Sequence, residues 1–405
     1  MDTPLQKHPS LSAAKTVYEV LIVITLTHLL NDMIQSVIPA SYPLIKDKFG
    51  FSFAQIGIIT LVFQFTTSIF QPFVGSYTDR HPKPYSLVFG MCITFIGLIM
   101  LATAPNFYII LISVATIGCG SAIFHPGASR VAQMAAWHRK GLAQSIFQVG
   151  GEGGNAIGPL VAALIVVPYG LKAIGWFTIC AIVAVVLLAW VGKWLSRQLV
   201  NGLHWKTESV DLGVRSLPKR KIGFALLLLV VLMFSKNLYI NCMANYFTFF
   251  LIDRFGISIQ ASQLCLFVYL FAFAVGIIVG GAVGDRVGRK YVILGSIFGA
   301  APFTVLLPFV SLGWTIALSI VIALVISSAF SSILVYATEL VPDKFGMIVG
   351  GFYGLSFGLG GIGSVFFGWL ADQTSIEFIF RITTILPLLG AIAVFLPNLN
   401  GGLKK

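Results

Sequence analysis

Six ionisable side chains lie within long apolar stretches of the sequence, where a charge is costly and is usually retained for function. They are Asp32, His125, Arg130, Glu152, Lys236 and Glu339. Carboxylates and imidazoles can carry protons, whereas lysine and arginine can hold an anion. The set therefore predicts proton transfer and anion binding in an apolar environment.

Asp32 shares one predicted helical face with His28 and Asn31, because the three residues follow i, i+3 and i+4 spacing. At 1.5 Å per residue, Asp32 lies about 21 Å into its apolar run, and Lys236 lies about as far into its own. Burial favours a neutral carboxyl and a nearby cation favours a charged one, so alternating exposure would load and release one proton at Asp32. Two interpretations stay open: a proton carrier beside His28, or a permanent ion pair with Lys236.

A second carboxylate, Glu152, lies in a glycine-rich stretch about 15 Å along its run. It is either a rival proton site or a solvated wall of a cavity. Lys236 and His125 are candidates for binding an anion, although His125 could instead make an ordinary hydrogen bond between helices. The further candidates for substrate contact are Asn31, Gln148 and Tyr239.

Apolar helices must position these side chains. A bilayer core of about 30 Å needs roughly 20 apolar residues per helix, and the chain contains twelve such runs. They span 18–40, 53–77, 85–104, 107–136, 142–168, 173–195, 222–252, 261–283, 291–310, 314–339, 346–371 and 378–397. The sequence therefore predicts an all-α integral membrane protein with twelve transmembrane helices in two six-helix bundles.

The composition excludes several classes of protein. Of the 405 residues, 57% are hydrophobic and 10% are charged, whereas soluble domains carry about 25% charged residues. A surface so poor in charge must face lipid, which excludes a cytosolic enzyme, a secreted disulfide scaffold and an ordinary nucleic-acid binder. The five cysteines lack metal-ligand spacing and no nucleophile accompanies His28 and Asp32. We therefore expect no cofactor, no metal and no enzymatic activity.

Basic residues predict the orientation. The net charge is +12, and nineteen of the 26 lysines and arginines fall on the side of both termini, against five on the other. The positive-inside rule places the side rich in basic residues in the cytoplasm. We expect cytoplasmic termini at 1–17 and 398–405, bundles at 18–195 and 222–397, and a cytoplasmic linker at 196–221.

One loop pattern, Gly-x-x-x-Asp-Arg followed by basic residues, occurs at the same place in each half, 206 residues apart. Its members are Gly75, Asp79 and Arg80 in the first copy, and Gly281, Asp285 and Arg286 in the second. Parallel six-helix halves are typical of secondary transporters, which hold substrate near the midplane between them.

Twelve helices, the repeated loop and a central basic linker resemble the major facilitator superfamily. The resemblance implies a cytoplasmic latch, in which the loop aspartate caps a helix N-terminus, pairs across the interface and releases when the transporter opens inward. Carried over to this chain, the resemblance implies that the aspartate and arginine of both loop copies, together with Arg289, form the latch. The first copy departs from the family pattern after Arg80, where His81-Pro82-Lys83-Pro84 replaces Gly-Arg-Lys. Arg130 and Glu339 are expected to join this gate, with ordinary topogenic charge as the alternative.

The fifth run contains Gly154-x-x-x-Gly158-Pro159, which resembles the antiporter motif of drug exporters in this superfamily. Small residues four apart let helices approach closely, and proline loosens the backbone hydrogen bonding. The motif favours export over uptake, and a generic packing face is the alternative.

Several phrases resemble the fosmidomycin-resistance branch of the superfamily. They include His28-Leu-Leu-Asn31-Asp32, Gln71-Pro72, Phe124-His125-Pro126, Gln144-Ser-Ile-Phe-Gln148 and Ile333-Leu-Val-Tyr336. The resemblance implies a proton-coupled, monomeric exporter of the phosphonate fosmidomycin in the bacterial inner membrane. An uptake symporter for a small organic anion and a non-transporting membrane sensor are the alternatives.

Overall fold

The computed structural model describes residues 16–81, 83–136, 140–200, 218–341 and 345–398, and the regular structure in these ranges is helical. The first group comprises α1 (Tyr18–Ala40), α2 (Tyr42–Phe49), α3 (Phe53–Arg80), α4 (Ser86–Ala102), α5 (Phe107–Ala136), α6 (Lys140–Val161), η1 (Ala162–Val166), α7 (Val167–Tyr169), η2 (Leu171–Trp176) and α8 (Phe177–Val200). The second comprises α9 (Lys219–Phe255), α10 (Ile259–Val287), α11 (Arg289–Leu306), η3 (Leu307–Phe309), α12 (Leu312–Ile326), α13 (Ala329–Leu340), α14 (Phe345–Gln373), α15 (Ile376–Thr383) and η5 (Leu386–Phe395).

The helices supply the membrane spans that the sequence predicts. Eleven spans in the described ranges are long and apolar enough to cross a bilayer, and α4 is a shorter apolar helix of 17 residues. Helices suit this environment because lipid offers no partner to a free backbone N–H or C=O. The prediction of an all-α membrane protein with twelve transmembrane helices is confirmed.

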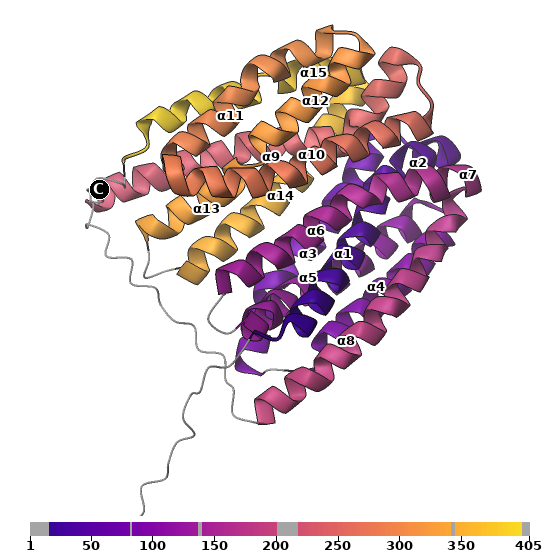
Figure 1. The fold of residues 1–405 in the computed structure, drawn as a ribbon. Helices are drawn as coiled ribbons and strands as arrows, with labels where there is room; N and C mark the ends of the chain where they lie inside the picture. Colours follow the sequence, from indigo (N-terminus) through magenta and orange to yellow (C-terminus); the bar gives the residue numbers. More distant parts are fainter. Residues whose placement is uncertain (1–15, 82, 137–139, 201–217, 342–344, 399–405) are drawn as a thin grey trace, which may run out of the picture.

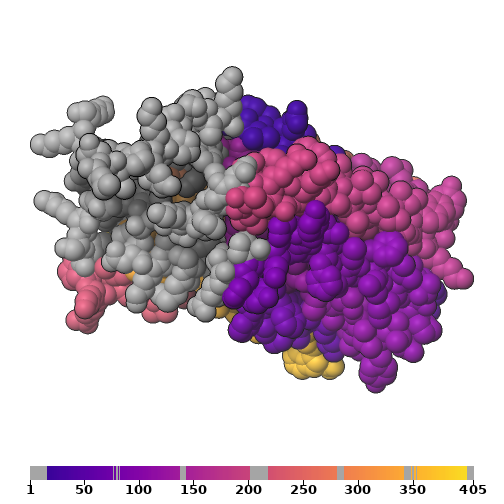
Figure 2. Space-filling model, turned by 90° about the horizontal axis from the view of Figure 1, so that it is seen from below, coloured from indigo at the N-terminus to yellow at the C-terminus, as the bar shows by residue number. Residues whose placement is uncertain are grey.

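The helices gather into two groups that lie side by side, α1–α8 in one and α9–η5 in the other (Figure 1). Seen from below, α1–α8 occupy one side of the molecule (Figure 2). Helix α8 continues to Val200 and α9 begins at Lys219, so both helices extend into the segment predicted as a linker. The predicted bundle limits themselves stay a prediction.

Hydrogen bonds join the two halves at the end of the molecule that contains α2. The Gln263 amide donates to the Ala40 carbonyl at 2.6 Å, and the Gln260 amide to the Ala163 carbonyl at 3.2 Å. Towards the middle, Gln64 donates to Asn241 at 2.9 Å. These contacts hold the first group of helices, α1–α8, against α9 and α10.

Helix α3 begins in a cap to which both halves contribute. The Ser52 hydroxyl accepts from the Gln55 backbone at 3.2 Å, in a capping box. The two preceding N–H groups, of Phe53 and Ala54, donate to the Asp372 carboxylate on α14 at 2.8 Å each. A helix N-terminus has free donors and a partial positive charge, so this carboxylate from the other half stabilises the junction.

We expect Asp372→Asn to loosen the junction, because an amide cannot accept two N–H bonds with a full negative charge. Losing such a cap costs about 0.5–2 kcal/mol, or about two- to thirtyfold in a conformational equilibrium. The measurement is the rate at which maleimide labels a cysteine at Ala54 in purified protein, with the native cysteines replaced. Asp47→Asn, on the exposed side of α2, is the matched control. Equal labelling rates in the two variants would contradict the prediction.

Candidate functional site

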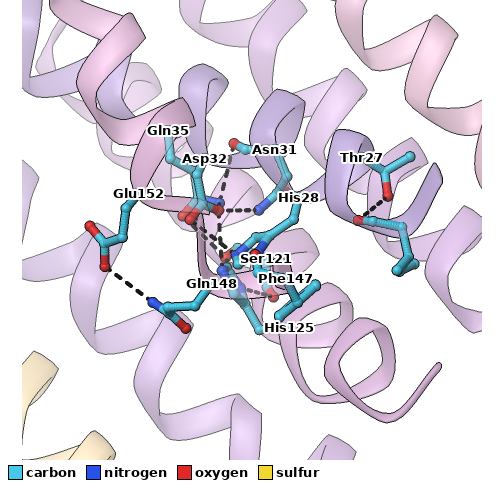
Figure 3. Close-up of polar contacts among 11 residues, drawn as sticks. Thr27, His28, Asn31, Asp32, Gln35, Ser121, His125, Phe147, Gln148 and Glu152 are labelled. Carbon is cyan, nitrogen blue, oxygen red and sulfur yellow. Dashed lines mark hydrogen bonds and ion pairs between the residues drawn. The ribbon is translucent and has the colours of Figure 1, made fainter. Parts of the chain in front are cut away.

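Two imidazoles converge on the carboxylate of Asp32 in the first half of the chain (Figure 3). His28 Nε2 lies 3.2 Å from Asp32 Oδ2, one helical turn away on α1. His125 Nε2, on α5, lies 3.2 Å from Asp32 Oδ1. The predicted grouping of His28 with Asp32 is therefore present, and the structure adds His125 to it. We call these three residues the His–Asp–His cluster.

The hydrogen bonds of Nδ1 in each histidine show which ring nitrogen carries the hydrogen. His28 Nδ1 is 2.7 Å from the Phe147 carbonyl, which can only accept, so Nδ1 carries the hydrogen. His125 Nδ1 is 3.0 Å from the Ser121 carbonyl and 3.1 Å from the Ser121 hydroxyl. That hydroxyl donates to Gln35 Oε1 at 3.1 Å, so His125 Nδ1 is again the donor. Both rings therefore present Nε2 to Asp32.

This arrangement ties the contacts of Asp32 to bound protons. A neutral imidazole with its hydrogen on Nδ1 would turn the Nε2 lone pair toward a carboxylate oxygen, which is repulsive. Each Nε2–oxygen contact at 3.2 Å therefore needs a proton between its two atoms. The cluster binds up to two such protons around one carboxylate.

Amide groups complete the surroundings of Asp32. Asn31 Nδ2 donates to Asp32 Oδ1 at 2.9 Å, and Gln35 Nε2 lies 3.4 Å from the same oxygen. Sequence analysis placed Asn31 with the substrate and did not select Gln35 or Ser121. Helical spacing could have indicated both residues. Gln35 follows Asp32 at i, i+3, and Ser121 precedes His125 at i, i+4, so each pair shares a helical face.

Helix α6 packs closely on the cluster. The Phe147 ring stacks on His28 at 3.9 Å between centroids. At Gly151 an added Cβ would lie 2.4 Å from His28 Cε1 and 2.9 Å from Asp32 Oδ2, so only glycine fits there. The glycine-rich sequence of α6 thus permits the close approach to α1.

The residues of the predicted antiporter motif extend this contact. A Cβ at Gly154 would meet the Leu29 carbonyl at 2.2 Å, and one at Gly158 would meet the Ser36 side chain at 2.5 Å. Pro159 lies near the end of α6, just before the π-helical segment η1. The motif is a packing face against α1, and its link to antiport stays a prediction.

The second predicted proton site, Glu152, points away from Asp32 (Figure 3). Its Oε1 accepts from Gln148 Nε2 at 3.1 Å, one turn earlier on α6. The sequence predicts that Gln148 contacts the substrate. The described contacts make Gln148 the partner of Glu152.

Lys236 on α9 is 2% exposed, and its ammonium lies 4.9 Å from the centre of the Phe330 ring. Among the described residues it has no ion-pair partner within 4.0 Å, so the alternative of a permanent Asp32–Lys236 ion pair is not observed. A cation–π contact stabilises an ammonium only partly. The other residue predicted to contact substrate from α9, Tyr239, is 2% exposed and packs in the hydrophobic core.

The predicted latch is described only in part. The side chains of Asp79, Arg80, Asp285 and Arg286, and the surroundings of Gly281, lie outside the described structure. Among the remaining latch residues, a Cβ at Gly75 would meet Pro126 at 3.8 Å, in ordinary contact. Arg130 donates to the Thr78 carbonyl at 3.0 Å, and Arg289 Nε lies 3.9 Å from Glu339 Oε1. The latch stays a prediction.

The His–Asp–His cluster is also the described group best suited to hold a metal ion, because one ligand atom from each residue lies within 4.8 Å of the others. Zinc sites use imidazole and carboxylate ligands of this kind. Here each histidine already contacts the Asp32 carboxylate at hydrogen-bond distance, 3.2 Å in both cases. The expectation of no metal stays a prediction.

The chain is similar in sequence to known proteins. The family model of the Major Facilitator Superfamily matches residues 24–258 and 229–404. The chain is 49% identical over 389 residues to the fosmidomycin resistance protein of Escherichia coli (strain K12), covering 96% of this chain and 95% of that protein. It is 40% identical over 395 residues to the uncharacterized MFS-type transporter YfnC of Bacillus subtilis (strain 168), covering 98% and 97%.

Solved structures show the same fold. A bacterial homolog of the human lysosomal transporter Spinster, in an inward-facing and occupied conformation, aligns with a TM-score of 0.71 over 95% of each chain. The two sequences are 16% identical, so the likeness concerns the fold alone.

Proposed function

Because the chain belongs to the major facilitator superfamily, within its fosmidomycin-resistance branch, we propose that it is a proton-coupled exporter of fosmidomycin-like phosphonates or related small drugs. The family indicates a multi-pass membrane transporter of small molecules rather than an enzyme. The substrate, the direction of transport and the coupling to protons belong to the proposal. So do the monomeric state and the bacterial inner-membrane location with cytoplasmic termini.

The observation that carries the proton coupling is the carboxylate held between two imidazoles. Asp32 is 8% exposed and contacts two Nε2 atoms at 3.2 Å each. Adding or removing a proton changes these contacts, one of which, between His125 and Asp32, joins α5 to α1. Movement of one half against the other would expose the site to each side in turn, as alternating access requires. Each charge that crosses 100 mV contributes about 2.3 kcal/mol to transport.

Glu152 is the second proton site of the proposal. It lies on α6, close to the cluster yet bonded to Gln148 rather than to Asp32. A separate carboxylate could carry a proton of its own or balance the charge of Lys236. The Asp32 variant described in the Discussion distinguishes between the two carboxylates.

Lys236 is the candidate anchor for the phosphonate, because it is a buried cation with only an aromatic ring as its described contact. Its ammonium would attract a phosphonate oxygen as a point charge. The predicted contacts of Asn31, Gln148 and Tyr239 with substrate are weaker parts of the proposal, because all three are engaged elsewhere or packed in the core.

An uptake symporter for a small organic anion is the second candidate, since Lys236 suits any small anion. Export is preferred because of the helix α6 motif, in which Gly154 and Gly158 pack against α1 ahead of Pro159, and because of the name of the Escherichia coli relative.

We expect the chain to raise fosmidomycin resistance in a bacterial host that lacks its own pump. A protonophore should abolish the effect, because collapse of the proton gradient removes the driving force. The measurement is drug susceptibility with membrane expression confirmed, together with accumulation of labelled phosphonate in everted vesicles.

The matched control is Asp47→Asn, which changes an exposed carboxylate remote from the cluster. Accumulation in everted vesicles supports export, whereas accumulation in right-side-out vesicles supports the symporter. A well-expressed protein with neither activity would overturn the assigned substrate.

A further inference from the structure

We propose that His125 is the residue through which protons enter and leave the Asp32 site, and that His28 is a positioning residue. The inference rests on the proposed proton coupling and adds the route of the proton to it. It also changes the role of His125, which sequence analysis had placed with the substrate.

The two rings differ in their access to solvent. The His28 side chain is 3% exposed and that of Asp32 is 11% exposed, whereas that of His125 is 26% exposed. Both Nδ1 atoms bind carbonyl groups, so protons can exchange only at Nε2. Of the two Nε2 atoms, only that of His125 belongs to a ring that water can reach.

The two rings also differ in their freedom to move. His28 is stacked on Phe147 at 3.9 Å, bonded to the carbonyl of the same residue, and pressed against the backbone of Gly151. His125 has no stacked ring among the described residues; its nearest ring is His28, edge-on at 5.2 Å. Its Nδ1 contacts are both to Ser121 on its own helix. His125 can therefore turn without breaking contacts between helices other than the one to Asp32.

In the described part of the chain, the charged and titratable groups nearest to His125 lie on three helices besides its own. Helix α1 contributes Asp32 and His28, α6 contributes Glu152, and α9 contributes Lys236 beyond it; Arg130 lies farther along α5, bonded to Thr78. Of these, only Asp32 touches the His125 ring through a hydrogen bond. A proton on His125 Nε2 thus has one hydrogen-bond acceptor among the described residues, Asp32 Oδ1.

The transfer step follows from these contacts. A hydronium ion at the exposed part of His125 gives its proton to His125 Nε2, so that an N–H bond forms, an O–H bond of the hydronium breaks, and water leaves. The new N–H donates to Asp32 Oδ1, and the proton then passes along this hydrogen bond, so that the N–H bond breaks and an O–H bond forms at Oδ1. The reverse exchange returns the proton to Nε2. On the other side the proton returns from Nε2 to water, and no electron is transferred. His28 keeps Asp32 in place throughout, through Oδ2.

The test is proton uptake by the purified protein after a pH jump, followed with a pH-sensitive dye. The part of the signal that Asp32→Asn removes belongs to the cluster. We expect His125→Gln to slow that part by about a hundredfold, since a positioned imidazole contributes about that much to proton transfer. Glutamine retains an N–H donor toward Asp32 but cannot relay a proton. Asp47→Asn, which changes an exposed carboxylate on α2, is the control and should leave the rate unchanged.

A second arm uses chemical rescue. Added imidazole should restore the rate in His125→Ala, whose place is reached by solvent, and not in His28→Ala, whose place is sealed by Phe147 and Gly151. Rescue of the His28 variant alone, or a wild-type rate in His125→Gln, would overturn the inference. Both arms use no substrate, so a failure of the proposed phosphonate export would be seen separately, in vesicles.

Discussion

Replacing Asp32 with asparagine is expected to abolish proton-driven transport while leaving exchange of substrate across the membrane measurable. Asparagine has nearly the shape of a protonated carboxyl and can donate to one Nε2 and accept from the other, so the packing around it persists. It cannot gain or lose a proton. The protonation state of the cluster would no longer change during the transport cycle. The proton gradient could then no longer drive the movement of one half of the protein against the other.

The measurement compares two assays on the same vesicles: accumulation driven by a pH gradient, and exchange of labelled for unlabelled substrate with no gradient. We expect the first to fall to the level of empty vesicles. Glu152→Gln is the matched variant, because it neutralises a second, half-buried carboxylate near the cluster, which is hydrogen-bonded only to Gln148 among the described residues.

The outcomes separate the two carboxylates. Retained accumulation in Asp32→Asn with its loss in Glu152→Gln would assign the coupling proton to Glu152. Retained accumulation in both variants would remove proton coupling from the proposal. Loss of exchange as well as accumulation in Asp32→Asn would indicate a structural role for the cluster.

The part of this site that lies on one helix could be predicted, because helical spacing determines which side chains meet. His28 and Asp32 are four residues apart, and their contact at 3.2 Å follows from that. The partner from α5 could not be predicted. Whether His125 or Lys236 meets Asp32 depends on how α5 and α9 are placed along α1, and no local sequence pattern encodes that placement.

The junction between the halves was missed for a similar reason. Asp372 stands at the end of an apolar run, where a charge usually marks a loop, and nothing near it in sequence indicates its target. Its partners are the backbone N–H groups of Phe53 and Ala54, more than 300 residues earlier. Backbone donors have no residue type, so composition and motifs cannot reveal such a contact.

Lys236→Gln is expected to weaken binding of phosphonates strongly while sparing neutral substrates. The ammonium is buried, at 2% exposure, and contacts the Phe330 ring with no described carboxylate within 4.0 Å. A charge in that setting is costly and is retained where an anion repays the cost. A hydrogen bond to a charged group contributes about 1.5–3 kcal/mol, so affinity should fall about ten- to 150-fold.

The measurement is the dissociation constant of fosmidomycin for purified protein, beside that of a neutral compound chosen because it binds the wild-type protein. Lys236→Arg is the matched control, because it keeps the charge and can pair with two phosphonate oxygens. Binding should then be retained, wholly or in large part. A second measurement is the exchange of labelled for unlabelled neutral compound in vesicles that contain the Lys236→Gln variant. It shows whether the variant still changes conformation during transport.

The pattern across ligands decides what Lys236 does. An equal loss for the phosphonate and for the neutral compound would mean that Lys236 supports the packing of α9 against α13, where Phe330 lies, and that the anion binds elsewhere. A selective loss that arginine repairs would assign the anion site to a cation in the second half of the chain. The proton site on α1 and α5 would then be in the opposite half, and substrate and proton would be coupled by the motion of the two halves rather than by direct competition for one side chain.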